Sequence, residues 1–257
     1  MALGFIGTGT IAAAIVRGLR RAGNSQPIVV SPRNAGLAAS LAIEFEDVTV
    51  ADSNQKVLDQ CDTVFIAVRP QVVDAVMGEL RFAPRHCVVS LVATVSLQRL
   101  EGLVAPAGRL LRAVPLPFVA MGLGGTLLYP ADAELGALFD QLGRTLVMAN
   151  EDDIDILTVA SSTMASAFAA QAAIDAWLVD HGVAPAQSRA YLSQLATGLA
   201  ASAAEHPETS YAQLTHEFAT PGGLNEQLRV DLDQAGMPEA YRAGLDALLA
   251  RVKGRPA

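Results

Sequence analysis

A glycine-rich turn, Gly7-Thr8-Gly9-Thr10-Ile11-Ala12, lies close to the start of this chain. It follows an apolar run that predicts a strand over Leu3–Ile6, and it opens a helical pattern over Ile11–Arg21. In a G-x-G-x-x-A turn the first glycine permits the tight bend and the second lets a pyrophosphate approach the backbone. The small third residue keeps the helix close to the strand. The free N–H groups at the helix start then face the phosphates, so the pattern favours a dinucleotide site over an ordinary strand-to-helix turn.

Short β-type runs alternate with helical segments up to about residue 149, which predicts a mostly parallel sheet covered by helices. After Asn150 the strand signal disappears, and the acidic residues 151–153 suit a helix N-terminus, where carboxylates meet the dipole favourably. We expect that helix to reach about Asp180, where His181-Gly182 ends it, and Pro185 to open the next helix. The predicted strands are Leu3–Ile6, Ile28–Val30, Val48–Val50, Thr63–Val68, Cys87–Leu91, Leu110–Val114, Thr126–Leu128 and Arg144–Met148.

The fold class predicted from this alternation is α/β. A Rossmann-type dinucleotide-binding domain over residues 1–150 is followed by an all-helical domain over residues 151–257, whose long uncharged helix predicts at least a dimer. Residues 156–174 carry no charged side chain and approach the length of a membrane span. Alanine and hydroxyl side chains dominate that stretch, so we expect close helix packing and no membrane partner.

Composition excludes other classes of protein. The 257 residues carry a net charge of −8, without the basic stripe typical of nucleic-acid binders, so we expect no nucleic-acid partner. We expect a cytoplasmic protein with no metal site, in which Cys61 and Cys87 are buried free thiols in a reducing compartment.

The end of the second predicted strand indicates which dinucleotide is bound. NAD-binding folds typically carry Asp or Glu about 20 residues after the glycines, where it binds the ribose 2′-hydroxyl. Here the strand is followed by Ser31, Arg33 and Asn34, and the first acidic residue beyond it is Glu44. Because a guanidinium matches the geometry of a phosphate, these three residues favour NADPH over NADH. The alternative is a solvated loop that happens to contain an arginine.

The chain is poor in side chains that catalyse hydride transfer to a carbonyl. Such a reaction needs a proton donor at the oxygen, usually His, Lys or Tyr. The predicted long helix contains no lysine, since the chain has only Lys56 and Lys253. An imine nitrogen is basic enough to arrive protonated, so hydroxyl and amide side chains suffice, and this composition favours imine over ketone reduction. The histidines beside turns or helix ends, which we expect to be solvated, are His86, His181 and His206.

Several motifs together resemble the pyrroline-5-carboxylate reductase family, whose members reduce a cyclic imino acid to proline. The resemblance spans nearly the whole chain and implies a helical domain that interlocks two subunits, with the active site between the nicotinamide and that domain. The residues that carry it are Gly4 to Gly9, Asn54, Val64 to Gln71, Ser90 to Ala93 and Thr220 to Gly223.

The resemblance also implies contacts with the cofactor. It places the pyrophosphate on the glycine loop, the 2′-phosphate at the end of the second strand, the adenosine side at Asn54, and the nicotinamide ribose near residues 67–70 and Ala93. The cofactor-binding residues expected from motif and resemblance are Gly7, Thr8, Gly9, Thr10, Ile11, Ser31, Arg33, Asn34, Asn54, Ala67, Val68, Arg69, Pro70 and Ala93.

On the substrate side the chain departs from the family. Where the family has Met-Pro-Asn-Thr-Pro, residues 114–118 read Val-Pro-Leu-Pro-Phe, and where it has Ser-Gly-Ser-Gly-Pro-Ala, residues 161–166 read Ser-Ser-Thr-Met-Ala-Ser. Asn225 stands where the family has a threonine thought to donate a hydrogen bond to the imine. We expect Asn225, Thr220 and Thr163 to be catalytic, and the N–H groups of Gly222, Gly223 and Leu224 to bind a substrate carboxylate. A simple helix-capping turn is the alternative interpretation.

The expected function is NADPH-dependent reduction of a cyclic imine, with pyrroline-5-carboxylate the first choice. Three alternatives stay open: reduction of a different imine or imino acid, a dinucleotide-binding protein without turnover, and a carbonyl-reducing dehydrogenase.

Overall fold

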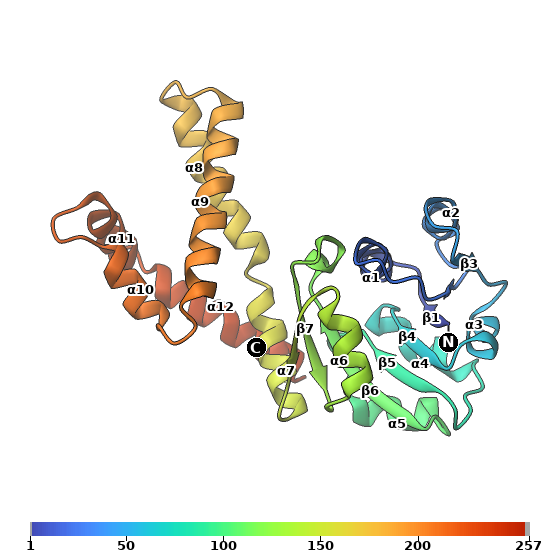
Figure 1. Cartoon of the computed structure of the whole chain (residues 1–257). Helices are drawn as coiled ribbons and strands as arrows, with labels where there is room; N and C mark the ends of the chain where they lie inside the picture. The colour runs from blue at the N-terminus through green and yellow to red at the C-terminus, as the bar shows by residue number, and fades with distance from the viewer. Residues whose placement is uncertain (1, 255–257) are drawn as a thin grey trace. The chain divides into compact units, whose positions relative to one another are not determined.

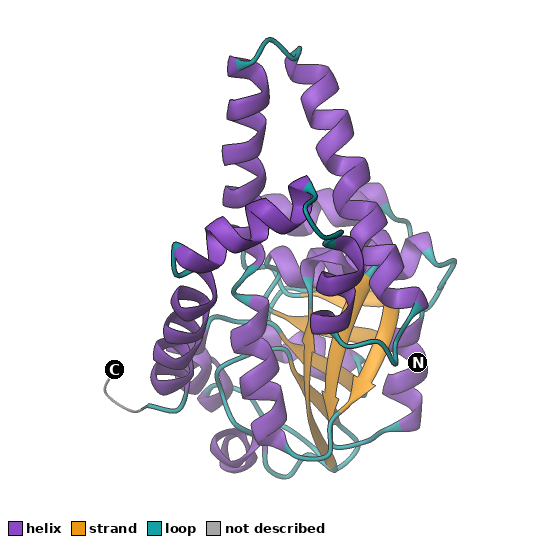
Figure 2. Cartoon of the chain, turned by 90° about the vertical axis from the view of Figure 1, so that its left-hand side faces the viewer, coloured by secondary structure: helices purple, strands orange, loops and turns teal. Residues whose placement is uncertain are grey.

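The strands form one eight-stranded sheet of order β3-β2-β1-β4-β5-β6-β7-β8 in the computed structural model, which describes residues 2–254 (Figures 1 and 2). All eight predicted strands are present, and pairing is parallel except between β6 and β7. The strands are β1 (Leu3–Ile6), β2 (Ile28–Val30), β3 (Val48–Val50), β4 (Thr63–Ile66), β5 (Cys87–Ser90), β6 (Arg109–Pro115), β7 (Gly124–Tyr129) and β8 (Gly143–Val147).

Helices cover both faces of the sheet, because the central strands β1, β4 and β5 are buried at every position and need apolar partners on each side. One buried cluster joins the sheet to α1, α2, η2 and α6, and a second cluster on the other face joins it to α3, α4 and α5. These helices are α1 (Thr10–Arg21), α2 (Ala35–Glu44), α3 (Asn54–Gln60), α4 (Val73–Gly78), α5 (Leu97–Val104), η2 (Pro117–Met121) and α6 (Ala133–Asp140). Two further helices of this part of the chain are η1 (Pro70–Val72) and α7 (Glu151–Ser161).

Strand order reverses between β1 and β4, both of which lie in the middle of the sheet. The chain runs from β1 to β2 and β3 on one side, then returns to β4 and continues outward through β5 and β6. In open parallel sheets ligands bind outside the carboxyl ends of the strands at such a reversal. The topology therefore directs attention to the loops that follow β1, β2, β4 and β5.

The chain divides into two compact units, Met1–Thr158 and Val159–Ala257, each of which we describe by itself. The first two turns of α7 thus belong with the sheet. The second unit is all-helical, as expected, and α8 and α9 lie side by side in it (Figures 1 and 2). Its helices after α7 are α8 (Met164–Asp180), α9 (Pro185–Glu205), α10 (Tyr211–Phe218), α11 (Leu224–Gln234) and α12 (Met237–Val252).

The long helix expected up to Asp180 is interrupted at Ser162 and Thr163, so it forms α7 and α8. The Thr163 hydroxyl donates to the carbonyl of Ala160 at 2.8 Å, a local side-chain bond of the kind that competes with regular helix geometry. The helix pair ends where expected, at Gly182 with a φ of +88°.

The helical unit buries little of its own apolar surface. Phe168, Trp177, Tyr191 and Leu228 are all more than half exposed, and α8 and α12 contain no buried residue among those described. By length and composition alone, the segment Glu151–Asp180 could cross a membrane; a single such helix is weak support for a span. The same apolar surface suits helix packing between subunits.

Candidate cofactor and substrate sites

The two glycines after β1 play different steric roles. Gly7 adopts a φ of +98°, and a Cβ there would lie 2.6 Å from the Ala67 carbonyl oxygen, so no other residue fits the turn. At Gly9 a Cβ would have no neighbour closer than 4.0 Å, which leaves open space in front of the backbone. Gly9 is the N-cap of α1 and no side chain caps that helix. The N–H groups of its first turn are therefore suited to an anion, as the motif predicts.

Ser31 has a different position from the one expected for a 2′-phosphate ligand. Its side chain is fully buried, and its Oγ accepts a hydrogen bond from the N–H of Gly7 at 2.9 Å. The hydroxyl of Thr8 donates to the Ser31 carbonyl at 2.7 Å. Ser31 therefore braces the glycine turn from behind, because the end of β2 packs directly against the turn that follows β1.

A cavity of about 250 Å³ lies at the carboxyl ends of β1, β2 and β4. Six of the expected cofactor residues are not part of the lining. Three of these directly continue lining segments in the sequence, namely Thr10 and Ile11 after Gly9 and Pro70 after Arg69, and the other three are Ser31, Asn54 and Ala93. The lining consists of Gly7, Thr8, Gly9, Arg33, Asn34, Ala67, Val68, Arg69 and Val72. The structure thus brings eight of the fourteen expected cofactor residues around one cavity.

Arg33 and Asn34 are the polar side chains of the cavity on the β2 side. Both are exposed, and Asn34 adopts a φ of +63° while its Nδ2 donates to the Thr8 carbonyl at 3.1 Å. This bond fixes the loop after β2 against the glycine turn and leaves the Arg33 guanidinium facing solvent. None of the described lining residues is acidic, so the cavity has no carboxylate that would bind a ribose 2′-hydroxyl. A pyrophosphate and a 2′-phosphate both fit this set of donors.

The expected substrate residues at 220–225 form the turn before α11 and the first two residues of that helix, and several of their N–H donors already have acceptors within the chain. The Gly223 N–H donates to the Thr220 carbonyl at 2.8 Å, and the Gly222 N–H donates to Glu226 Oε2 at 2.7 Å. The side-chain amide of Asn225 donates to the Phe218 carbonyl at 3.0 Å. A carboxylate of the chain itself therefore occupies one of the donors that we expected to hold the substrate.

Thr163, the third expected catalytic residue, lies elsewhere in the helical unit. It lines a separate cavity of about 340 Å³ with Ser162, Ser166 and Tyr241, and residues 220–225 do not contribute to that lining. Tyr241 and Ser166 approach each other there, with 3.5 Å between their hydroxyl oxygens. Within this unit the expected substrate residues thus fall into two groups.

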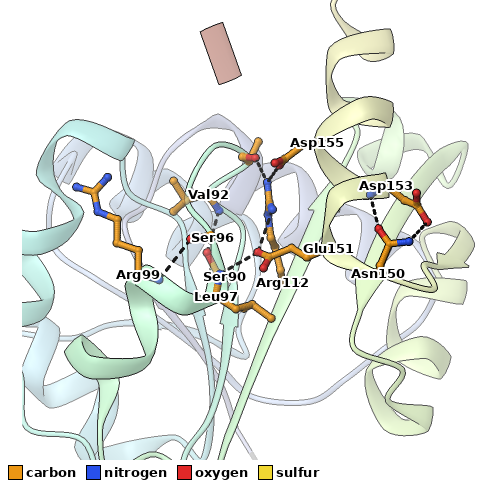
Figure 3. A network of polar contacts seen from close by, with 11 residues as sticks. Ser90, Val92, Ser96, Leu97, Arg99, Arg112, Asn150, Glu151, Asp153 and Asp155 are labelled. Carbon is orange, nitrogen blue, oxygen red and sulfur yellow. Dashed lines mark hydrogen bonds and ion pairs between the residues drawn. The ribbon is translucent and has the colours of Figure 1, made fainter. Parts of the chain in front are cut away.

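A buried ionic network beyond the end of β5 was not expected from the sequence (Figure 3). The Arg112 side chain in β6 is 1% exposed, and its guanidinium contacts Glu151 at 3.0 Å and Asp155 at 2.6 Å. It also donates to the carbonyl of Ala93. The signal was present in the sequence: an arginine in the middle of the apolar strand pattern at 110–114 needs a buried counter-charge, and the acidic residues at 151–155 can supply it.

The expectation that His86 is solvated is wrong. The side chain is 2% exposed; its Nδ1 accepts from the Ala83 N–H at 3.0 Å and its Nε2 lies 3.1 Å from the Leu58 carbonyl. Burial lowers the pKa of His86, so the ring is a neutral structural element. Cys61 and Cys87 are buried free thiols, as expected, and burial raises the pKa of each to about 11. Within residues 2–254 no group of three metal-binding side chains is present.

Comparison with known proteins matches both parts of the chain to families. Residues 2–94 match the family described as NADP oxidoreductase coenzyme F420-dependent, and residues 151–254 match pyrroline-5-carboxylate reductase dimerisation. Pyrroline-5-carboxylate reductase 3 of Macaca fascicularis is 30% identical over 268 residues, which cover 98% of this chain and 94% of that protein.

Solved structures agree with the sequence relatives. The 1-pyrroline-5-carboxylate reductase of Streptococcus pyogenes superimposes with a TM-score of 0.84 at 25% identity and covers 99% of this chain and 98% of its own. A Plasmodium falciparum pyrroline carboxylate reductase with NADP bound shares the fold, with a TM-score of 0.82 at 18% identity over 99% of this chain and 97% of its own. Because a sequence relative is 30% identical over nearly its full length, the chain belongs to the pyrroline-5-carboxylate reductase family of oxidoreductases.

Proposed function

We propose that this protein reduces the C=N bond of a cyclic imine with NADPH, and that pyrroline-5-carboxylate, reduced to proline, is its first-choice substrate. The observation that carries the proposal is the cavity at the reversal between β1 and β4, which combines the glycine turn with Arg33 and has no acidic residue in its described lining. Family membership supports the C=N reaction. A role in proline biosynthesis follows if this substrate is correct.

The fit to NADPH rests on donors rather than on shape alone. The open backbone at Gly9 and the uncapped start of α1 suit the pyrophosphate, while Arg33 and Asn34 suit the 2′-phosphate. When bound, NADPH supplies the hydride. The chain's own task is then to orient the imine, donate a hydrogen bond to its nitrogen and exclude water. An NADP-bound structure in the same fold supports the choice, whereas the loop after β2 contains no residue that would favour NADH.

On the substrate side we propose that Asn225 donates the hydrogen bond near the imine nitrogen, with Thr220 and Thr163 as further hydroxyl donors. An amide can replace the hydroxyl that the family resemblance implies there, although it is longer. Replacement of Asn225 by Ala is then expected to lower turnover and leave NADPH affinity nearly unchanged. We place the substrate carboxylate at the N–H groups of Gly222, Gly223 and Leu224.

A second candidate function is supported by one specific contact. Because Glu226 Oε2 accepts from the Gly222 N–H at 2.7 Å, a negative charge already occupies part of the proposed carboxylate site. A second carboxylate beside it would be repelled. This contact favours an imine without a carboxyl group, reduced on the same scaffold.

We further propose a cytoplasmic homodimer or larger homo-oligomer, without nucleic-acid or membrane partners, assembled through residues after about Asp153. The exposed apolar side chains of α8, α9 and α11 and the match of residues 151–254 to a dimerisation family support this assembly. We place the domain boundary at residue 150, with the dinucleotide-binding domain over 1–150 and the dimerisation domain over 151–257. This boundary follows the start of the family match at residue 151, whereas the two compact units divide eight residues later, after Thr158. Sedimentation at micromolar concentration tests the assembly, and a compact monomer would contradict it.

Steady-state NADPH oxidation tests the reaction class. The panel contains pyrroline-5-carboxylate, the cyclic imine 1-pyrroline, which lacks the carboxyl group, and ketones of matched size. Turnover of at least one imine with no turnover of the ketones is expected. Turnover of ketones alone indicates a carbonyl-reducing dehydrogenase, and NADPH binding without any turnover indicates a dinucleotide-binding protein that is not an enzyme.

A further inference from the structure

The loop between β5 and α5, residues 91–96, is held by polar contacts from three directions (Figure 3). At its start, Ser90 Oγ accepts from the Val92 N–H at 3.3 Å. At its end, Glu151 Oε1 accepts from the N–H of Leu97, the first residue of α5, at 2.8 Å. Between these points the Arg112 guanidinium donates to the Ala93 carbonyl.

Arg112 is suited to this contact because its own position is fixed. It pairs in register with Ser90 across β5 and β6, so its side chain leaves the sheet at the end of β5. Nη1 contacts Glu151 at 3.0 Å and Nη2 contacts Asp155 at 2.6 Å, and both carboxylates belong to the first two turns of α7. Two charge-assisted bonds on a planar guanidinium fix its orientation, which a flexible ammonium group cannot reproduce.

The place of this loop in the sheet gives the contact a function. A dinucleotide on a doubly wound sheet crosses the carboxyl ends of the strands, with one nucleotide on each side of the strand-order reversal. Arg33 lines the cavity on the β2 side; with the 2′-phosphate bound there, as proposed above, the nicotinamide half extends over β4 and β5. The first loop beyond β5 is the one that Arg112 holds.

We propose that Arg112 is a positioning residue for the nicotinamide half of the cofactor. It fixes the Ala93 carbonyl and with it the loop after β5, while Glu151 and Asp155 fix the guanidinium. This inference rests on the proposed function in two respects: the bound molecule is a nicotinamide dinucleotide, and its 2′-phosphate lies at Arg33. A purely structural brace would contribute to stability without distinguishing the two halves of that molecule.

The test compares two ligands by titration calorimetry on the full-length protein. NADPH carries both halves, whereas 2′,5′-ADP carries only the phosphorylated adenosine half. For Arg112→Lys we expect NADPH to bind about tenfold more weakly, since a charge-assisted fork is lost, while 2′,5′-ADP changes by less than about twofold. Without ligand, the amides of Val95 and Leu97 are expected to exchange hydrogen faster in Arg112→Lys than in the wild type.

Arg109→Lys is the matched control. Arg109 lies on the same strand and also contacts two carboxylates, Asp132 at 2.7 Å and Glu134 at 3.0 Å. It is the first residue of β6 and pairs with Cys87 at the start of β5, away from the loop that follows β5. The Arg109→Lys substitution should leave the affinities for NADPH and 2′,5′-ADP and the exchange rates of the loop amides unchanged. Equal weakening of both ligands by Arg112→Lys, or no weakening of NADPH, would overturn the proposal, as would a wild-type protein that binds both ligands equally well.

A milder variant covers the case in which Arg112→Lys does not fold, as judged by circular dichroism. Asp155→Asn retains the contacts of Arg112 with Glu151 and Ala93 and removes one charge. We therefore expect a smaller weakening of NADPH binding, again without a change in the affinity for 2′,5′-ADP. An unchanged ratio of the two affinities in that variant overturns the proposal. Because binding requires no turnover, absence of imine reduction in the wild type would refute the proposed function without affecting this result.

Discussion

The N–H of Gly7 donates a 2.9 Å hydrogen bond to the buried Oγ of Ser31, which joins the turn after β1 to the end of β2. Ser31, which the strand-end pattern assigns to the 2′-phosphate, therefore holds the backbone of the glycine turn, where we propose that the cofactor binds. On the proposed function, NADH and NADPH both bind to that backbone, whereas only NADPH has a 2′-phosphate for Arg33. The two residues thus have distinguishable effects on cofactor binding.

Replacement of Ser31 by Ala is expected to weaken NADPH and NADH by the same factor. It leaves the buried Gly7 N–H without its acceptor, which costs roughly 1–3 kcal/mol in the free energy of unfolding. Urea unfolding measures that loss and calorimetry the two affinities. Ser210→Ala is the control, because it also removes an acceptor from a backbone N–H, that of Gln213 in α10, but should leave both affinities unchanged. A loss confined to NADPH would show that Ser31 contacts the 2′-phosphate after all.

Replacement of Arg33 by Ala is expected to weaken NADPH about 10- to 100-fold, because a hydrogen bond between charged groups contributes roughly 1.5–3 kcal/mol. NADH lacks the 2′-phosphate, so its affinity should be nearly unchanged. Arg21→Ala, which removes an exposed arginine at the last position of α1, controls for the general change in charge. Equal weakening of both nucleotides by Arg33→Ala would mean that Arg33 does not bind the 2′-phosphate.

Replacement of Glu226 by Gln is expected to raise kcat/KM for pyrroline-5-carboxylate about fivefold. Glutamine retains an oxygen for the Gly222 N–H but removes a charge whose repulsion of a carboxylate ~4 Å away is worth ~1 kcal/mol in water. The rate with 1-pyrroline should not change. Glu239→Gln, in the first turn of α12, is the matched control. If both imines respond equally, Glu226 does not sense the substrate carboxylate.

His86 is expected to make stability depend on pH. Its pKa is lowered in the folded state from an ordinary value of 6.5, chiefly by burial, and protonation of Nδ1 would break its bond with the Ala83 N–H. The contribution is therefore complete above pH 6.5 and is lost as the pH falls towards the folded pKa. Urea midpoints at about pH 7.5 and about pH 5 should differ less in His86→Gln than in the wild type. His206→Gln, at an exposed histidine, should keep the wild-type difference.

The sheet could be predicted from the sequence because its signals are local. Apolar strands with turn residues between them specify all eight strands, and the glycine motif specifies the turn at Gly7. The roles of Ser31, His86 and Arg112 could not be predicted in the same way, because each depends on which distant segment packs against it. Ser31 meets the glycine turn, His86 meets the Leu58 carbonyl, and Arg112 meets α7. A polar residue at a strand end or a turn has the same local pattern whether it faces solvent or a neighbour.

Substrate-side residues illustrate the same limit. The capping pattern at 220–225 predicts a helix with Thr220 as N-cap and Pro221 at its first position, whereas α11 begins at Leu224 with Gly223 as N-cap. That Glu226 would accept from Gly222 and Asn225 donate to Phe218 depends on side-chain rotamers rather than on a motif. Thr163, between α7 and α8, lines another cavity of the helical unit.

Transfer of deuterium from the cofactor to the imine carbon tests the central claim most directly. The protein is incubated with NADPH that carries deuterium at both hydrogen positions of nicotinamide C4 and with each imine of the panel, and the products are analysed by mass spectrometry. If the protein reduces a C=N bond with NADPH, the cyclic amine formed contains one deuterium on the former imine carbon. Oxidation of the deuterated cofactor with no deuterium on that carbon, or no amine formed from any imine, would contradict it.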